Sequence, residues 1–301
     1  MGDNKKAMVL ASFAADSLAL GAHWIYDTSA IKRSFGRVDS FLKPTSNSFH
    51  PTKGRGDFTH YGDQAFVLLE SLAARGGFDL HDFSERWRAL FETYQGYIDH
   101  ATRVTLSRYA AEHGVEEAGS PSDDLAGASR IASLVYFHRN DLPGLVKAAA
   151  AQTMMTHNDP ATIKSAEFFA RVAWQVLEGA SPVDAMKTVS QESYEDSPLY
   201  NWVQVGIASK AMDSVEVISR FGQTCHTMEA FPGVVHLIAR HEQDLKEALV
   251  ASVMAGGDSA ARGMMVGMVL GAHLGMDALP PAWLSELNKG EQILALLEKG
   301  S

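Results

Sequence analysis

Asp258 stands in a stretch whose residue types could bind a ligand. Residues 254–267 read MAGGDSAARGMMVG, so Gly256 and Gly257 come directly before the aspartate and an apolar helical pattern follows it. Glycine allows positive φ angles, so the backbone here can turn sharply and let a ligand approach closely. A carboxylate at a helix start can instead cap the helix by accepting hydrogen bonds from free amide groups. Both interpretations are open for Asp258.

Other carboxylates lie at or near predicted helix starts. Asp63 precedes an apolar helical run, Asp16 lies within the first predicted helix, and Asp159 directly precedes Pro160. Proline is favoured at the first helical position, so capping is the preferred interpretation for Asp159. For Asp63, as for Asp258, capping and ligand binding are both open.

Helical periodicity dominates the chain and must position these side chains. Apolar residues recur every three or four positions in residues 64–75, 82–98 and 160–179, and Asp124 precedes a further such segment, 125–137. Alternation typical of strands is scarce. We therefore predict an all-α fold.

Glycine recurs every four residues along a predicted helix near the C-terminus, at Gly263, Gly267 and Gly271. A stripe of residues without side chains lets a neighbouring helix approach closely, so we expect this helix to be central, with its methionines filling core gaps. Residues 32–62, rich in Gly, Pro, Ser and Thr, interrupt the helical pattern. A long irregular segment in a helical domain is typically functional or disordered.

Composition excludes several classes of function. Hydrophobic residues make up 46% of the 301 residues, and the formal net charge of −10 leaves no basic surplus for general nucleic-acid binding. Cys225 is the one cysteine, which excludes an intrachain disulfide and a multi-cysteine zinc site and is typical of a reducing compartment. The apolar stretch 263–275 is shorter than the roughly 20 residues that a membrane span needs. We expect a cytoplasmic protein with no nucleic-acid and no membrane partner.

Five blocks of the chain carry the motifs of a known family in the same order: residues 14–24, 58–72, 125–137, 155–170 and 255–287. The last block is the clearest, with its Gly-Gly-Asp start, small-residue helix and closing Pro-x-x-Trp-Leu. The chain therefore resembles the ADP-ribosylglycohydrolases, all-α hydrolases that remove ADP-ribose from proteins. The resemblance implies a single compact orthogonal helical bundle of the ADP-ribosylglycohydrolase type, over residues 1–301.

The resemblance also implies an activity, the hydrolysis of a glycosidic bond in an ADP-ribosyl or related ribosyl compound. The substrate would be a small ribosyl or nucleotide molecule or an ADP-ribosylated protein. Asp63 and Asp258 would hold the ribose hydroxyls or orient water beside an oxocarbenium-like state. His60 and His157 would move protons, because histidine changes charge near neutral pH.

The substrate-binding residues that we expect from the same blocks are Asp16, His23, Tyr61, Gln64, Arg130, Asn158, Gly256, Gly257 and Arg262. The arginines would meet phosphate groups. A purely structural role is open for each of these arginines and for the histidines. If Asp63 and Asp258 act in catalysis, replacing either by alanine should abolish activity at the cost of little more than a helix cap.

The family holds two divalent metal ions with its Thr-Asp-Asp and Asp-x-Asp-Thr blocks. Here Asp63 and Asp258 are the carboxylates that remain for Mg²⁺ or Mn²⁺, while Ala260 and Ala261 stand where the second block has ligands. Hard divalent cations need several oxygen ligands, so too few remain for a dinuclear site. Arg262 could replace part of the missing charge by pairing with Asp63 or Asp258, or by meeting a phosphate.

The lost ligands keep a second function open. The chain carries Tyr-Gly-Asp-Gln at residues 61–64, as a crystallin-like subset of the family does. The alternative is therefore a non-catalytic protein of the same fold that binds a ribosyl or nucleotide ligand.

Overall fold

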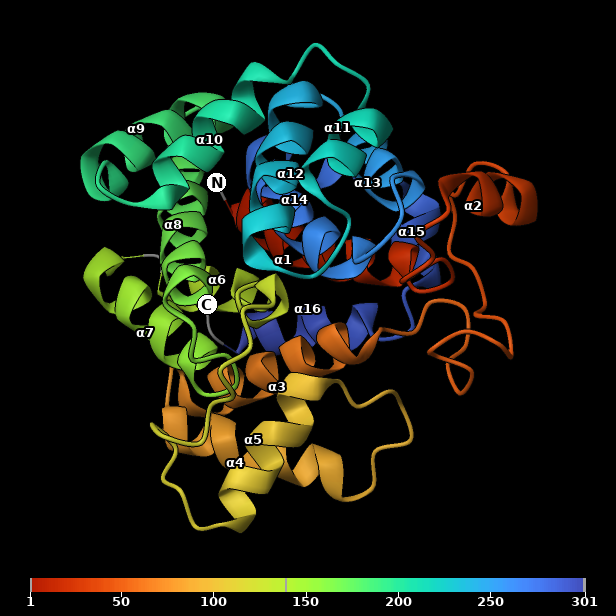
Figure 1. Ribbon diagram of the computed structural model, residues 1–301. Helices are drawn as coiled ribbons and strands as arrows, with labels where there is room; N and C mark the ends of the chain where they lie inside the picture. Colours follow the sequence, from red (N-terminus) through yellow and green to blue (C-terminus); the bar gives the residue numbers. More distant parts are fainter. Residues whose placement is uncertain (1, 139, 300–301) are drawn as a thin grey trace.

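The computed structural model describes residues 2–138 and 140–299, and these residues fold mostly into helices (Figure 1). The first part of the chain contains α1 (Gly2–Ala19), α2 (Thr28–Phe35), α3 (His60–Arg75), α4 (Leu80–Glu92), α5 (His100–Ala110), the short 3₁₀ helix η1 (Leu125–Gly127), α6 (Ala132–Phe137) and α7 (Leu142–Met154). The second part contains α8 (Pro160–Leu177), α9 (Pro182–Tyr194), α10 (Pro198–Ala208), α11 (Ser214–Phe221), α12 (Thr227–Arg240), α13 (Leu245–Met254), α14 (Ser259–Leu274), η2 (Met276–Ala278), α15 (Pro281–Glu286) and α16 (Gly290–Glu298). The prediction of an all-α fold is confirmed.

α1 and α14 lie side by side at the centre of the molecule, although they come from opposite ends of the chain (Figure 1). Their backbones approach so closely that a Cβ added at Gly267 would lie 2.5 Å from the carbonyl oxygen of Ala11. A Cβ at Gly271 would lie 2.8 Å from the carbonyl oxygen of Ala7. The predicted close packing along the glycine stripe is confirmed, and the methionines of α14 are buried in the same core.

The other helices surround this central pair. α8, α12 and α13 pack against α14, and α7 and α9 pack against α8. α3 packs against α4, α6 and α16. α3, α4 and α5 form the lower part of the molecule in Figure 1. Among the described helices, none combines the length and the apolar character that crossing a membrane would require. The single-domain assignment stays a prediction.

The irregular segment is shorter than predicted, because α2 takes its first residues and ends at Phe35. The rest of the segment runs without a helix as far as Thr59. It is tied to the core by the buried side chains of Phe41, His50 and Phe58. His50 reaches the surroundings of Asp258 in this way, so the segment contributes to the candidate site.

The structure shows which of the predicted aspartates cap a helix. Asp159 caps α8 by accepting a hydrogen bond from Thr162 N at 2.9 Å, as predicted. The capping interpretation of Asp63 is wrong: α3 begins earlier, with Thr59 as its N-cap, and Asp63 lies in its first turn. Hydrogen bonds inside the helix satisfy the backbone there, so the Asp63 side chain is available to other groups.

Candidate functional site

Asp258 both caps α14 and anchors a buried polar cluster. Its Oδ1 accepts a hydrogen bond from Ala261 N at 3.3 Å and lies 3.2 Å from His23 Nε2. Its Oδ2 accepts a hydrogen bond from the Tyr61 hydroxyl at 3.0 Å. The residue is only 1% exposed. Both oxygen atoms are therefore bound by groups of the protein itself.

The charge of Asp258 follows from this cluster. Burial alone would raise its pKa, but the hydrogen bonds from His23 and Tyr61 outweigh burial, so the pKa lies below its ordinary value. Burial lowers the pKa of His23, which keeps that imidazole neutral. His23 therefore donates from Nε2 to the ionised Asp258 and accepts at Nδ1 from His50 Nε2, 2.9 Å away. The three side chains form one buried chain of hydrogen bonds.

The two glycines before Asp258 allow neighbouring segments of the protein, rather than a ligand, to approach the backbone closely. Gly256 and Gly257 have φ angles of 71° and 66°. A Cβ at Gly256 would lie 2.6 Å from the carbonyl oxygen of Ile25, and a Cβ at Gly257 would clash with the backbone of Gln223. The predicted close approach exists, but its partners are two neighbouring segments of the protein.

The Arg262 side chain also binds the protein itself. Its guanidinium is fully buried and donates from Nη2 to the carbonyl oxygens of Ser252 and Gly256, each at 2.7 Å. The predicted ion pair with Asp63 or Asp258 is therefore wrong. Arg262 instead holds the end of α13 to the turn that leads into α14.

Arg130, which lies between η1 and α6, is also buried. It donates to Gln64 Oε1 at 2.9 Å and to Thr156 Oγ1 at 2.6 Å, and Trp87 Nε1 donates to the same Gln64 oxygen at 2.7 Å. Burial lowers the pKa of Arg130 to about 10, so the guanidinium stays charged at neutral pH. In this arrangement both Arg130 and Gln64 bind protein atoms.

The predicted proton carriers lie in the same interior region. His60 Nε2 is 3.2 Å from Asp99 Oδ2, and both side chains are buried. His157 Nδ1 is 2.8 Å from Thr156 Oγ1. Burial and the charge of Arg130 lower the pKa of His157 to about 3, so the expectation that it titrates near neutral pH is wrong. Asn158, beside it, is exposed.

Asp63 belongs to a different part of the surface. It pairs with the Lys53 ammonium group and accepts a hydrogen bond from the Tyr94 hydroxyl at 2.6 Å. It lines a cavity of about 390 Å³ that Lys53, Tyr94 and Lys289 also line, and Asp258 is not among the lining residues. This cavity therefore does not bring Asp63 together with Asp258.

The dinuclear metal site that the resemblance implies does not fit these residues. Ala260 and Ala261 carry no donor atom, and Asp258 already binds His23, Tyr61 and a backbone amide. A divalent ion at Asp258 would have to displace these partners and would still lack charged oxygen ligands.

Asp16 joins α1 to the start of α3 rather than facing solvent. Its carboxyl group accepts hydrogen bonds from Thr59 N, at 2.7 Å, and from the Thr59 hydroxyl. Complete burial raises its pKa from 3.8 to about 7, although the bonds from Thr59 oppose the shift.

This shift predicts a pH dependence of stability. Between about pH 4 and pH 7 the folded state keeps a proton on Asp16 that the unfolded state has released, so stability falls as the pH rises. The full effect is at most about 4 kcal/mol. Urea unfolding of the wild type and of Asp16→Asn should therefore diverge over this range, with the variant gaining relative stability as pH rises. If the free energies of unfolding of the two proteins change in parallel from pH 4 to pH 8, the raised pKa of Asp16 is contradicted.

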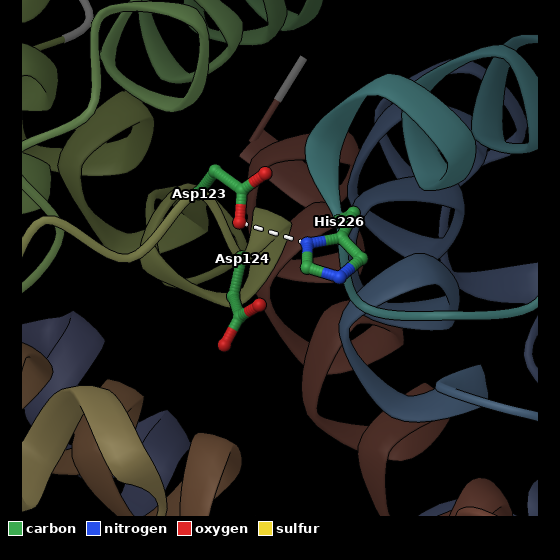
Figure 2. A group of neighbouring side chains, drawn as sticks. All are labelled: Asp123, Asp124 and His226. Atoms are coloured by element: carbon green, nitrogen blue, oxygen red, sulfur yellow. Dashed lines mark hydrogen bonds and ion pairs between the residues drawn. The ribbon is translucent and has the colours of Figure 1, made fainter.

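A group that the sequence analysis missed lies where two loops meet. Asp123, Asp124 and His226 bring one ligand atom each to within 4.8 Å of one another (Figure 2). His226 Nδ1 is 2.8 Å from Asp123 Oδ1, and these two side chains are 52% and 47% exposed respectively. We call these three residues the junction.

Backbone pairing fixes the junction. Thr227 N donates to the carbonyl oxygen of Asp123 at 2.8 Å, and Leu125 N donates to that of Cys225 at 2.8 Å. Asp124 and His226 form an isolated antiparallel bridge between the two segments. The sequence indicates the junction only weakly, because Asp124 is placed like a helix cap and His226 lies about a hundred positions away.

The junction is electrostatically connected to the buried cluster. Burial raises the pKa of Asp124, and the negative charges of Asp258 and Asp99 raise it further. Tyr26, which is 47% exposed, is influenced by both groups: burial raises its pKa to about 12, and the charges of Asp258 and Asp124 contribute to the shift. The negative charge of Asp258 is thus felt at the junction.

Comparisons with known proteins cover almost the whole chain. The family model described as ADP-ribosylglycohydrolase matches residues 3–299. Crystallin J1A of Tripedalia cystophora is 24% identical over 99% of this chain and 96% of its own length. The ADP-ribosyl-[dinitrogen reductase] glycohydrolase of Rhodospirillum rubrum is 23% identical over 77% of this chain and 74% of its own length.

Among solved structures, an ADP-ribosylglycohydrolase-related protein complex has the same fold. Its TM-score is 0.77 at 24% identity, and the match covers 99% of this chain and 96% of that one. The predicted resemblance and the fold type are confirmed.

Proposed function

This chain belongs to the ADP-ribosylglycohydrolase family, and on that premise we propose that it hydrolyses a glycosidic bond of an ADP-ribosyl or related ribosyl compound. The substrate is a small ribosyl or nucleotide molecule or an ADP-ribosylated protein. The observation that carries the proposal is the junction, an accessible group of two carboxylates and an imidazole set in a fold shared with glycohydrolases.

The reaction uses the charge of the junction. As the bond between the anomeric carbon and its leaving nitrogen or oxygen breaks, positive charge develops on the ribose ring, and the carboxylates of Asp123 and Asp124 stabilise it. Water attacks the anomeric carbon and gives up a proton to His226, while the leaving group takes up a proton from the solvent. His226 then returns its proton to the solvent, so that one water molecule is consumed in all. The products are the ribosyl compound, which now has a hydroxyl group on its anomeric carbon, and the protonated leaving group.

The buried cluster positions this surface. Asp258 holds Tyr61 and His23, and Tyr26, three residues after His23, is close enough to the junction for the charge of Asp124 to raise its pKa. We assign Asp258 the role of a positioning residue, since its carboxylate is buried and its two oxygen atoms are bound. His60 and Asp99 form a second buried pair, 3.2 Å apart.

Binding without turnover is the second candidate. Three observations favour it. The Asp258 carboxylate is already hydrogen-bonded to His23 and Tyr61, and Ala260 and Ala261 carry no side-chain atom that could bind a metal ion. The chain is also similar to crystallin J1A. In that case the ligand class is the same, and the junction holds ribose hydroxyls without breaking a bond.

Turnover assays distinguish the two candidates. We expect the purified chain to release ADP-ribose from at least one of ADP-ribosylated arginine, ADP-ribosylated serine and free ADP-ribosyl derivatives. Asp124→Asn should then lower kcat/KM by about 100-fold or more, because a charged group at the reacting centre is lost. Release of ADP-ribose is measured by chromatography.

The matched control removes another exposed acid–histidine pair, His113 and Glu117, which is not part of the junction. His113→Asn with Glu117→Gln should keep full activity. Ligand binding without turnover on every substrate would establish the second candidate. Activity that survives Asp124→Asn would show that the junction is not the reacting centre.

A further inference from the structure

We propose that the junction binds one divalent transition-metal ion through Asp123, Asp124 and His226. The three side chains come from two loops, and each offers one ligand atom, two carboxylate oxygens and one imidazole nitrogen in all, within 4.8 Å of one another. In Figure 2 Asp123 faces the His226 ring, and the Asp124 carboxylate lies to one side of this pair. This position is separate from the one that the family resemblance implies for metal ions, which is occupied here by protein side chains.

The distances suit coordination. Two ligand atoms that each lie about 2.1 Å from one ion are about 3 Å apart in octahedral geometry. His226 Nδ1 and Asp123 Oδ1 are 2.8 Å apart, so an ion can replace the proton that they share. The Asp124 ligand atom lies within 4.8 Å of the others, a gap that rotation of its short side chain can close.

The Asp124 carboxylate would exchange two neutral hydrogen-bond partners for the ion. It stands at the N-cap position of η1 but makes no side-chain capping bond to that helix. Its side-chain partners are instead the hydroxyl of Ser122 and the thiol of Cys225. Cys225 therefore brings a fourth potential donor atom to the edge of the junction, next to one of the three ligands.

The surrounding charge favours a cation. The charged groups that act on Asp124 include Asp258 and Asp99, both negative, and those that act on His226 include Glu229. Bringing several carboxylates together in a partly buried region costs free energy, and a dication at the junction offsets that cost.

The donor set selects the metal. Carboxylates alone suit Mg²⁺ and Ca²⁺, whereas imidazole suits transition metals such as Zn²⁺. One imidazole with two carboxylates therefore favours Mn²⁺ and Zn²⁺ over Mg²⁺. Any part that the ion plays in hydrolysis, such as lowering the pKa of a bound water, rests on the proposed function, but the binding itself does not.

Binding is tested on the full chain after treatment with a chelator and desalting. Titration with Mn²⁺, followed by loss of the free-ion signal in electron paramagnetic resonance, should give one bound ion per chain. Zn²⁺ should displace it, and Mg²⁺ at the same concentration should not. Asp123→Asn with Asp124→Asn should weaken Mn²⁺ binding more than about tenfold.

The control variant is again His113→Asn with Glu117→Gln, which should bind Mn²⁺ as the wild type does. The backbone carbonyl of Asp123 that binds Thr227 remains in the junction variant, and unchanged thermal unfolding without metal checks its fold. No binding by the wild type, or equal binding by the junction variant, overturns the metal site. Hydrolysis that persists in excess chelator overturns only its role in the reaction, and metal binding without any hydrolysis overturns only the proposed activity.

Discussion

Replacing Asp258 by alanine should lower the free energy of unfolding by about 3–5 kcal/mol. The substitution leaves two buried donors, the Tyr61 hydroxyl and His23 Nε2, without their common acceptor. It also removes the cap on Ala261 N. From the sequence we expected little more than the loss of a cap, and the buried cluster is the reason for the larger figure. Urea unfolding followed by circular dichroism measures the change.

An exposed aspartate provides the comparison. Asp213 caps α11 by accepting hydrogen bonds from the amides of Val215 and Glu216, at 2.9 and 3.1 Å. Asp213→Ala should cost about 1 kcal/mol, the ordinary value of an N-cap. If Asp258→Ala costs no more than Asp213→Ala, the hydrogen bonds of His23 and Tyr61 contribute nothing measurable, and the positioning role of Asp258 fails with them.

The helical fold was predictable because its signals are local. Apolar spacing indicates helices, proline after Asp159 indicates a helix start, and the glycine stripe indicates a close helix neighbour. The start of α3 was misjudged for the same reason: Thr59 caps it, but the apolar pattern becomes regular only at residue 64. Periodicity finds the body of a helix more readily than its first turn.

The partners of the candidate residues were not predictable, because they depend on which segments meet in space. Gly256 and Arg262 have types and spacing that suit a ligand, yet each contacts backbone from a neighbouring segment. The junction shows the opposite case. Asp124 and His226 have no sequence relation, and only the pairing of two distant loops brings them together.

Gly267→Ala should lower the free energy of unfolding by about 2–3 kcal/mol, although alanine favours helices over glycine by up to about 1 kcal/mol. The new Cβ would lie 2.5 Å from the carbonyl oxygen of Ala11, and a backbone atom in the centre of α1 cannot move away without separating the two helices. Thermal and urea unfolding measure the loss.

Gly263→Ala makes the same chemical change four residues earlier in α14 and should have the opposite sign. Its Cβ would lie 3.5 Å from the Cβ of Ala15, which is ordinary van der Waals contact. The helix preference of alanine then remains, and stability should rise by about 0.5–1 kcal/mol. The sign difference between the two variants isolates the approach of α1 and α14 from helix propensity. If both substitutions stabilise the protein, the two central helices are not in backbone contact at Gly267.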